Sequence, residues 1–370
     1  MIELFFIVPL LTLLIFYGGY YLFGFIYGKR IRYRSDDSCL PTVSLVIATY
    51  NEEESIAQKI QNTVDLDYPK DRTEVIFVDS STDGTLETIK SFKKTSSSKV
   101  LVIEEKIRRG LASALNAGYS AASGEVVIKT DCDILLEKSS IREIVKYFSP
   151  DVGAVSGAIV ISNKSNVEKG YRSIFEKLRT AESNLDSTYL YNPFCAFRKN
   201  LIEPVDARSV ADDAELALKI RKKGYRTLYS PSAIAYETSP ISIRDRINQK
   251  SRRAEGHIRL IFQNLNLLFN PKLSKFGLII FPANFFMMIL SPWLIVATLI
   301  LGELSLGITL GSFCALLFLL GLTVLIILMY VKSTPKMIAG FIDAQLNLII
   351  GFLKLATQGP SYMWTKEKRL

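Results

Sequence analysis

The sequence predicts an α/β protein whose mostly parallel sheet is joined to membrane helices. From Thr42 onward, short apolar runs rich in β-branched residues alternate with helical stretches. This alternation is typical of a sheet covered by helices on both faces. Three stretches with almost no charge, 2–27, 276–302 and 305–331, each exceed the ~20 residues that a helix needs to cross a bilayer. Acidic residues follow several predicted strands, which indicates a site at one edge of the sheet.

The first apolar stretch is predicted to be a retained anchor rather than a cleaved signal peptide. Its basic residues follow the apolar run instead of preceding it, and no small-residue cleavage site is evident. These residues are Lys29, Arg30, Arg32 and Arg34. Because basic flanks favour the cytoplasmic side of a membrane, the segment that follows is predicted to be cytoplasmic. The predicted domains are an anchor at 1–28, a cytoplasmic domain with membrane-proximal helices at 29–275, and two membrane helices at 276–331.

The remaining part, 332–370, contains an apolar stretch at 337–357 with polar interruptions. These interruptions are Asp343, Gln345, Asn347 and Lys354. If this stretch crossed the membrane, the basic tail with Lys366, Lys368 and Arg369 would lie outside, against the charge rule. We expect a helix in the membrane interface, and a fourth span is the alternative.

The elements of the cytoplasmic domain follow from periodicity and turn residues. Strands are expected at 42–49, 74–79, 100–103 and 126–129, with helices at 53–64, 85–93, 110–122 and 139–148. Further on, we expect one or two strands within 152–161, an amphipathic helix at 167–186, and a helix at 214–223. Gly224 is a typical residue for the end of that last helix.

The composition excludes several classes of site. The formal net charge is +9, but no groove-reading or aromatic motif accompanies the basic residues, so we expect no nucleic-acid partner. The four cysteines form no C-x-x-C pair, and there is a single histidine, His257. A disulfide framework, a zinc site and a histidine-based triad are therefore not expected.

The acidic pair Asp131 and Asp133 is the strongest chemical signal. It follows the apolar run 125–130, so we expect both carboxylates to project from a strand tip, with Cys132 turned away. Two such carboxylates repel unless a cation lies between them. Mg²⁺ or Mn²⁺ suits oxygen ligands and fills its shell with phosphate oxygens, so the pair predicts a metal that holds a diphosphate. A solvated loop is the alternative.

Four other groups accompany this pair in a fixed order. They are Thr49-Tyr50-Asn51-Glu52, Asp79 before a Ser-Ser-Thr-Asp-Gly-Thr turn, Asp212-Asp213, and Gln249-Lys250-Ser251-Arg252-Arg253. The set resembles the family 2 inverting glycosyltransferases, which have a GT-A fold and, in the ceramide glucosyltransferase and polysaccharide synthase branch, a membrane anchor. The resemblance covers roughly residues 40 to 260.

The resemblance implies roles for the residues of the donor site. The residues implied to hold the nucleoside, expected to be uridine of a UDP-sugar, are Thr49, Tyr50, Glu52 and Asp79. Asp133 is implied to bind the metal directly, while Asp131 contacts ribose or metal-bound water. Asp83 and Gly84 fit a simple turn with a helix cap.

The second acid of Asp212-Asp213 is implied to be the catalytic base. Asp213 would remove the proton from the acceptor hydroxyl in a single displacement with inversion at the anomeric carbon. Such a base contributes about 10²–10⁴-fold to a rate. The alternative is that both are ordinary acids at a helix N-terminus.

The last group resembles the Gln-x-x-Arg-Trp signature of the family. Gln249 and Arg252 share a helix face and are implied to reach the diphosphate. Arg253 replaces the tryptophan, which weakens a processive role. The family also has a lysine where this chain has Leu111, and either Arg108 or Arg109 is a candidate to replace that charge.

The sequence therefore predicts a membrane-bound transferase with a nucleotide-sugar donor and a lipid or membrane-associated acceptor. A processive polysaccharide synthase, similar to those that make hyaluronan, cellulose or poly-N-acetylglucosamine, is the alternative within this class. A membrane scaffold without catalysis is the alternative outside it.

Overall fold

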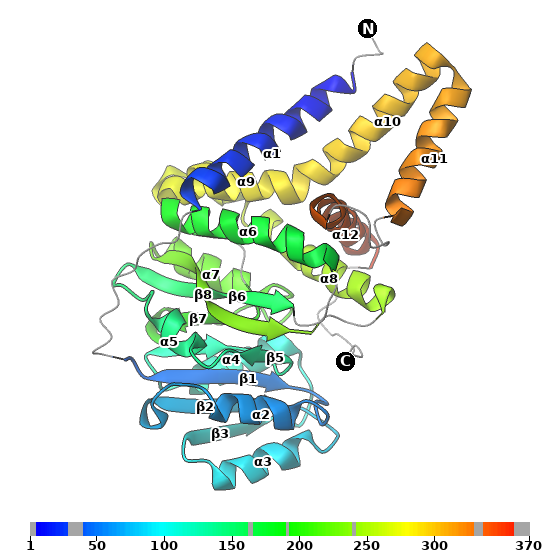
Figure 1. Cartoon of the computed structure of the whole chain (residues 1–370). Coiled ribbons are helices and arrows are strands. Elements are labelled where there is room, and N and C mark those ends of the chain that lie inside the picture. The colour runs from blue at the N-terminus through cyan, green and yellow to red at the C-terminus, as the bar shows by residue number, and fades with distance from the viewer. Residues whose placement is uncertain are drawn as a thin grey trace.

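The computed structural model describes residues 5–28, 40–161, 166–189, 192–238, 242–328 and 336–358. An α/β domain forms one end of the molecule, and long apolar helices project from the other end (Figure 1). The basic residues from Lys29 to Arg34 and the basic tail from Lys366 to Arg369 lie outside the described residues. The cytoplasmic location of the domain, which was inferred from these charges, thus stays a prediction.

Eight strands form one mixed sheet. They are β1 (Val43–Thr49), β2 (Thr73–Asp79), β3 (Lys99–Glu104), β4 (Val126–Lys129), β5 (Ile134–Leu136), β6 (Val152–Ile161), β7 (Cys195–Arg198) and β8 (Arg226–Glu237). Their spatial order is β3-β2-β1-β4-β7-β6-β8-β5. The pairs among β1, β2, β3 and β4 are parallel, as is the pair of β6 with β8. The β7 strand is antiparallel to both β4 and β6, and β5 is antiparallel to β8. The carboxyl ends of β1, β2 and β4 therefore lie at one edge.

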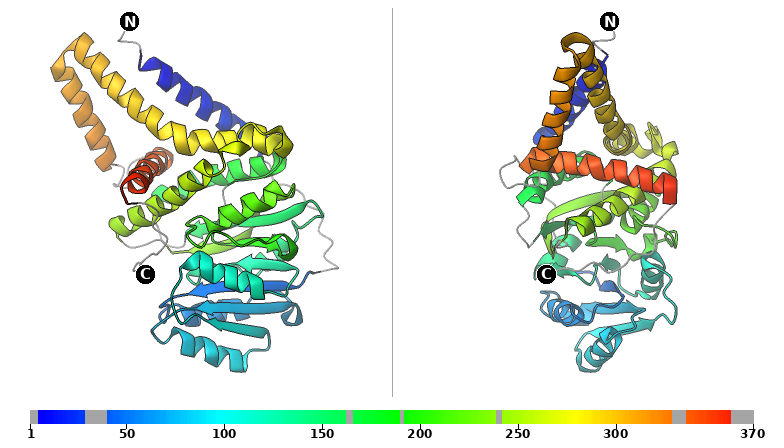
Figure 2. Two further views of the ribbon diagram at one scale, coloured as in Figure 1. Left: turned by 180° about the vertical axis from the view of Figure 1, so that it is seen from behind. Right: turned by 90° about the vertical axis from the view of Figure 1, so that its right-hand side faces the viewer.

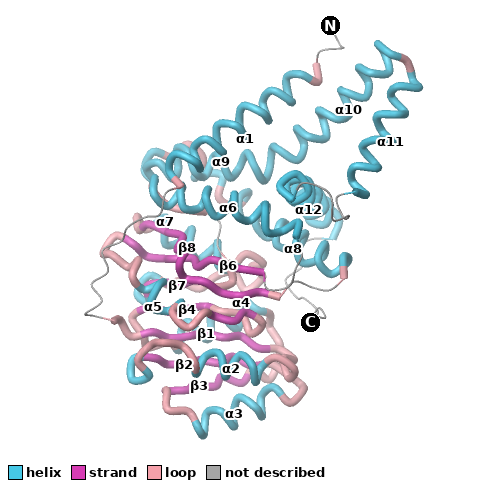
Figure 3. The backbone as a smooth tube through the Cα atoms, viewed as in Figure 1, coloured by secondary structure: helices cyan, strands magenta, loops and turns pink. Residues whose placement is uncertain are grey.

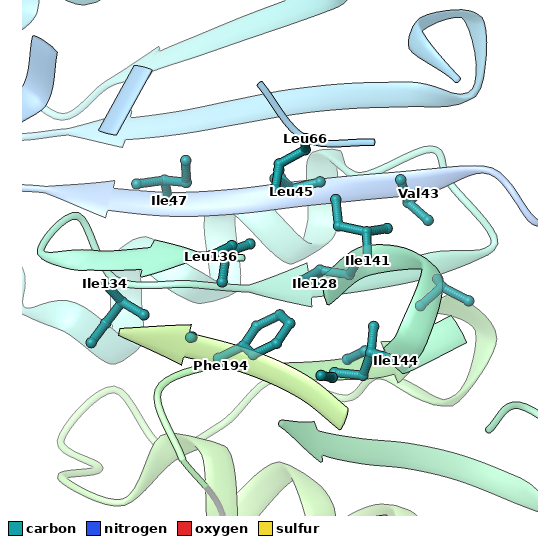
Figure 4. Close-up of a cluster of buried hydrophobic side chains, with 14 of the residues drawn as sticks. Val43, Leu45, Ile47, Leu66, Ile128, Ile134, Leu136, Ile141, Ile144 and Phe194 are labelled. Atoms are coloured by element: carbon teal, nitrogen blue, oxygen red, sulfur yellow. The ribbon is translucent and has the colours of Figure 1, made fainter. Parts of the chain in front are cut away.

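Helices cover both faces of the sheet, as predicted (Figure 3). They are α2 (Ile56–Val64), α3 (Thr85–Thr95), α4 (Leu111–Ala121), α5 (Ser140–Val145) and α7 (Asp212–Lys222). Alternate side chains of β1 explain the two layers, because Val43, Leu45 and Ile47 pack on one face while Val46 packs on the other. Figure 4 shows the first of these clusters, in which side chains of β1 lie beside those of α5 and β4.

The remaining helices join the domain to the apolar part. They are α1 (Ile7–Tyr27), α6 (Asn166–Leu185), α8 (Ile243–Phe262), α9 (Phe281–Phe285), α10 (Ser291–Leu310), α11 (Ser312–Leu328) and α12 (Lys336–Gln358). Short π-helical turns, Phe276–Ile280 and Phe286–Leu290, flank α9. Figure 2 shows α1, α10 and α11 extending away from the sheet, with α12 lying across their base.

Three stretches of the described chain are long and apolar enough to cross a membrane: Ile7–Tyr27, Phe276–Leu310 and Ala339–Thr357. The second is longer than expected. The lone charge at Glu303 predicts an end at residue 302, whereas the helix continues to Leu310 and turns at Gly311, where φ is +86°. Helix propagation tolerates one acidic residue, but the left-handed backbone at Gly311 stops it.

The α12 helix packs on α8 through polar and close backbone contacts. Lys250 pairs with Asp343 at 2.8 Å, and Lys354 donates to the Ser251 hydroxyl at 2.8 Å. A Cβ atom added to Gly351 would lie only 3.0 Å from a backbone nitrogen of α8. Asp343 and Lys354 of α12 therefore have partners on α8, and the interfacial position of α12 stays a prediction, as does the alternative of a fourth span.

A buried carboxylate fastens α1 to the domain. Glu182 of α6 accepts hydrogen bonds from the Tyr20 hydroxyl at 2.5 Å, from Asn284 at 2.8 Å and from Thr188 at 2.6 Å. These donors come from α1, α9 and the loop after α6. A buried carboxylate is tolerated when donors surround it, so this network fixes where α1 meets the domain.

Candidate active site

The carboxyl ends of β1 and β2 carry the first predicted residues. Thr49 and Asp79 are register partners in the parallel pair. Asn51 has a left-handed backbone conformation with φ of +54°, and it contacts the loop that follows Asp79. The Asn51 side chain accepts a hydrogen bond from the Thr82 amide at 2.8 Å, and the Glu52 amide donates to Thr85 at 2.8 Å. The structure therefore brings the predicted nucleoside residues together in one pair of loops.

Asp79 is the most enclosed residue of this group. Its side chain is 1% exposed and accepts a hydrogen bond from the Ser81 amide at 3.0 Å. Burial raises the pKa of this carboxyl, and the hydrogen bonds from Ser81 oppose that rise. Asp79 thus also serves as an anchor of the loop after β2.

Tyr50 has a basic neighbour that the sequence offered only as an alternative. The guanidinium carbon of Arg108 lies 3.7 Å from the centre of the Tyr50 ring. Arg109 instead pairs with Glu105 at 2.7 Å. Arg108 comes from the loop between β3 and α4, where Gly110 with φ of +98° starts the helix.

The acidic pair lies on a turn rather than on a strand. β4 ends at Lys129, and the Ile134 amide closes the turn by donating to the Asp131 carbonyl at 3.2 Å. The expectation that a strand tip aligns the two carboxylates is therefore wrong. Asp131 and Asp133 are both partly exposed, while the intervening Cys132 is buried in the core.

Two contacts join this turn to the nucleoside loops. The Ser55 hydroxyl donates to a Glu52 carboxylate oxygen at 2.6 Å and lies 4.0 Å from the Cys132 sulfur. The buried Lys59 ammonium donates to the Thr130 hydroxyl at 2.8 Å and to the Ile134 carbonyl at the start of β5. Burial lowers the pKa of Lys59 to about 8, and nearby acidic groups limit the fall. The α2 helix therefore holds the two loop systems together.

The second acidic pair meets the first at a buried lysine. Asp212 and Asp213 begin α7, and Lys129 pairs with Asp212 at 2.8 Å and approaches Asp131 at 3.9 Å. Burial alone would lower the pKa of Lys129, but Asp212, followed by Asp131 and Asp213, raises it well above its ordinary value. Burial raises the pKa of Asp212 to about 6, against the attraction of Lys129. The four residues form one electrostatic cluster.

The α8 helix lines the same cluster. Gln249, Arg253 and His257 are spaced four residues apart, so they share one helical face. Arg253 pairs with Glu237 at 2.8 Å, and its side chain remains 40% exposed. Glu237 is the main cause of a raised pKa of Arg253, with smaller contributions from two acids of the cluster, Asp131 and Asp213.

His257 is close enough to Asp213 for that carboxylate to affect the pKa of its imidazole. Its ring is 5.8 Å from the ring of Tyr189, which is fully buried. Burial lowers the pKa of His257, and Asp213 opposes this change. Burial therefore favours the neutral form of this imidazole.

Asp79 thus ends β2 and Asp131 and Asp133 follow β4, while Asp213 comes from α7 and Gln249 and Arg252 from α8. Asp131 and Asp213 share Lys129 and Arg253 as electrostatic neighbours. Asp79 lies farther away, because β2 is separated from β4 by β1. Two strand spacings correspond to about 10 Å. Such a span suits an extended ligand whose two ends require different partners.

Three features of this site escaped the sequence: Lys129, the Arg108–Tyr50 stack, and the Arg253–Glu237 pair. Lys129 left one signal, because a lysine inside an otherwise apolar strand must find a buried partner. Arg252, the predicted diphosphate residue, is partly exposed on α8 beside buried Gln249.

The acidic turn fits a hard divalent cation. Within the described residues, no three His, Cys, Asp or Glu side chains gather as a complete metal cage. Mg²⁺ and similar ions take one or two protein carboxylates and complete their shell with water and phosphate oxygens. The partly exposed pair of Asp131 and Asp133 matches that donor set.

Two sequence profiles and several known proteins are similar to this chain. The sequence profile "Glycosyl transferase family 2" matches residues 44–205, and "Glycosyl transferase family group 2" matches residues 126–331. The "Probable glycosyltransferase YdaM" of Bacillus subtilis is 28% identical over 334 residues, which cover 82% of this chain and 77% of that protein. The poly-beta-1,6-N-acetyl-D-glucosamine synthase of Staphylococcus epidermidis is 28% identical over 262 residues, which cover 65% of this chain and 63% of that protein.

One solved structure resembles almost the whole chain. It is the mannosyltransferase PcManGT from Pyrobaculum calidifontis, in complex with GDP-Man and Mn²⁺. The TM-score is 0.80 and the sequence identity is 26%. The match covers 96% of this chain and 99% of that chain, so the apolar helices are included.

Proposed function

We propose that this chain, which belongs to the glycosyl transferase family group 2, transfers a sugar from a nucleotide donor to an acceptor at a membrane surface. The observation that supports this most is the meeting of two acidic pairs at Lys129. One pair suits a divalent ion and the other suits a base. A transferase needs both within the length of one donor sugar.

The donor would lie along the edge of the sheet. Thr49, Tyr50, Glu52 and Asp79 would hold the nucleoside, and Gln249 and Arg252 would reach the diphosphate. Asp133 and Asp131 would hold Mg²⁺ or Mn²⁺. That ion, when bound, neutralises the charge on the leaving nucleoside diphosphate.

Asp213 would act as the base in a single displacement. It begins α7, is partly exposed, and has Lys129 as an electrostatic neighbour in common with Asp131. As the sugar leaves the diphosphate, the acceptor hydroxyl becomes acidic and Asp213 takes its proton. The acceptor attacks from the face opposite the leaving group, so the anomeric configuration inverts.

The nucleoside and the acceptor are the finer parts of the proposal. The family resemblance favours a UDP-sugar, whereas the similar archaeal mannosyltransferase was solved with GDP-Man. We propose a lipid acceptor, because α8 lies between the acidic cluster and the helices that could cross a membrane. We also propose a multi-pass membrane protein with its α/β domain in the cytoplasm, because basic residues follow the first apolar stretch.

A processive polysaccharide synthase is the second candidate. The staphylococcal relatives, which are poly-beta-1,6-N-acetyl-D-glucosamine synthases, favour it. Arg253 in place of the family tryptophan argues against it. Product size separates the two, since a single transfer gives one product of fixed mass and a synthase gives a ladder.

The test uses the full chain in lipid nanodiscs with membrane lipid extract as acceptor. Release of nucleoside diphosphate is measured with UDP-glucose, UDP-N-acetylglucosamine and GDP-mannose, with and without Mn²⁺ or Mg²⁺. Asp213→Asn is expected to lower turnover about 10²–10⁴-fold while nucleotide binding persists. Glu215→Gln, on the same helix but paired with Lys219, is the control. Absence of metal-dependent release from every donor, or full activity in Asp213→Asn, would refute the proposal.

A further inference from the structure

We propose that Lys129 is a resident cation of the active site, which competes with the divalent ion for Asp131 and positions the base by holding Asp212. This inference rests on the proposed function. It assigns a role to a residue that belongs to neither acidic pair.

The position of Lys129 is unusual for a lysine. It is the last residue of β4, its side chain is 3% exposed, and its neighbours in β4 are apolar. A buried ammonium is costly unless charged partners surround it. Here the ammonium lies 2.8 Å from Asp212, which begins α7, and 3.9 Å from Asp131, which is in the turn after β4.

The contact with Asp212 fixes the base segment. Asp212 is buried and is the first residue of α7, so the ion pair ties the start of this helix to the end of β4. Asp213 is the next residue, and its own carboxylate accepts a hydrogen bond from the Ala214 amide at 2.7 Å. The backbone that carries the proposed base is therefore set by Lys129. We regard Lys129 as a positioning residue.

The contact with Asp131 affects the metal site. An ammonium 3.9 Å from a carboxylate partly neutralises it, and a divalent ion at the same carboxylate is repelled by that ammonium. Asp133 would then supply most of the protein's attraction for the ion. The affinity for the free ion stays moderate, and the diphosphate of the donor supplies the remaining ligands.

Removing the charge of Lys129 and removing the charge of Asp212 should change the affinity for Mn²⁺ in opposite directions. Lys129→Met removes the competing cation, so Mn²⁺ should bind about tenfold more tightly. Asp212→Asn removes an anion and leaves Lys129 closer to Asp131, so Mn²⁺ should bind about tenfold more weakly. The double variant Lys129→Met/Asp212→Asn removes one charge of each sign and should return to within about twofold of the parent chain.

The experiment measures Mn²⁺ binding by electron paramagnetic resonance of the free ion, with each full-length variant in nanodiscs. Thermal unfolding identifies variants that fold. If Lys129→Met alone does not fold, the comparison of Asp212→Asn with the double variant still tests the idea. Restored affinity in the double variant supports competition at Asp131, and unchanged affinity in Asp212→Asn overturns it.

Positioning is tested by kinetics of the same double variant. Turnover should stay at least about tenfold below that of the parent chain, with the donor KM unchanged, because α7 has lost its tie to β4. Parent-like turnover would overturn the positioning role. Asp133→Asn separates this inference from the proposed function: if the parent chain binds no Mn²⁺, or Asp133→Asn binds it equally well, the proposed metal site itself fails.

Discussion

The Arg108 guanidinium stacks on the ring of Tyr50, with 3.7 Å between the guanidinium carbon and the ring centre. Tyr50 belongs to the loop proposed to hold the nucleoside. Arg108 thus brings a positive charge to the donor side of the site, in a chain that has Leu111 where the family has lysine.

We predict that Arg108→Leu raises the donor KM about five- to tenfold and leaves kcat within about twofold, since a partly exposed cation–π contact contributes about 1 kcal/mol. Arg109→Leu is the matched control, because Arg109 is exposed and pairs with Glu105. Steady-state kinetics with the preferred donor measure both. An equal KM in the two variants would show that the stack has no part in donor binding.

The carboxylate of Glu74 stabilises the fold at neutral pH. It is buried, and its partners are Ser44, Ser123, Gly124 and, at 2.9 Å, Lys99. Burial alone would raise its pKa, but these partners lower it to about 2. Its stabilising effect is therefore complete above pH 4.5, the ordinary pKa, and is lost as the pH falls toward 2.

Glu74→Gln is expected to lower Tm at pH 7 and to unfold at nearly the same temperature as the parent chain near pH 2. Thermal unfolding in detergent across this range measures the gap between the two chains. Glu104→Gln is the control, because its exposed pair with Lys90 contributes little. A gap that stays constant down to pH 2 would contradict the assignment.

The α12 helix approaches the backbone of α8 closely at Gly351. A Cβ atom there would lie 3.0 Å from the Glu255 amide nitrogen and 3.1 Å from the Ser251 carbonyl oxygen. Backbone atoms cannot move aside without shifting α8, which carries Gln249 and Arg252. We therefore predict that Gly351→Val lowers Tm by several degrees and weakens nucleoside diphosphate binding.

Gly302→Val is the matched control for this substitution. Gly302 lies on α10, and a Cβ atom there would meet nothing within 4 Å. Calorimetric titration with the nucleoside diphosphate and Mn²⁺ compares the two. Equal binding in both variants would mean that α12 does not support the diphosphate residues.

The sheet could be predicted where strands are continuous apolar runs. β1, β2 and β4 were expected within about one residue, because strands buried on both faces are composed mainly of apolar side chains. β8 was missed, because Pro231 and polar residues interrupt it. Its register with β6 shifts between Tyr229 and Ile234, so the irregularity accommodates that proline.

The candidate site could be predicted in part, for a related reason. Asp79 and the pair of Asp131 and Asp133 were located because they follow predicted strands. The pairing of Lys129 with Asp212 depends on where α7 packs, which no local pattern contains. Arg253 is four residues from Gln249, and Asp131 and Asp213 affect its pKa. Which arginine meets these acids depends on how α8 packs, and the sequence does not contain that information.

The hydrogen bonds that Glu182 accepts from Tyr20 and Asn284 have a consequence for how the protein is assembled. Tyr20 leaves the ribosome early and Asn284 late, so this network of hydrogen bonds forms only after both segments have been synthesised. A fragment that lacks α1 and α9 would leave the Glu182 carboxylate without two of its hydrogen-bond donors and would expose the apolar surface around it. Biochemistry on this enzyme should begin from intact, lipid-embedded material.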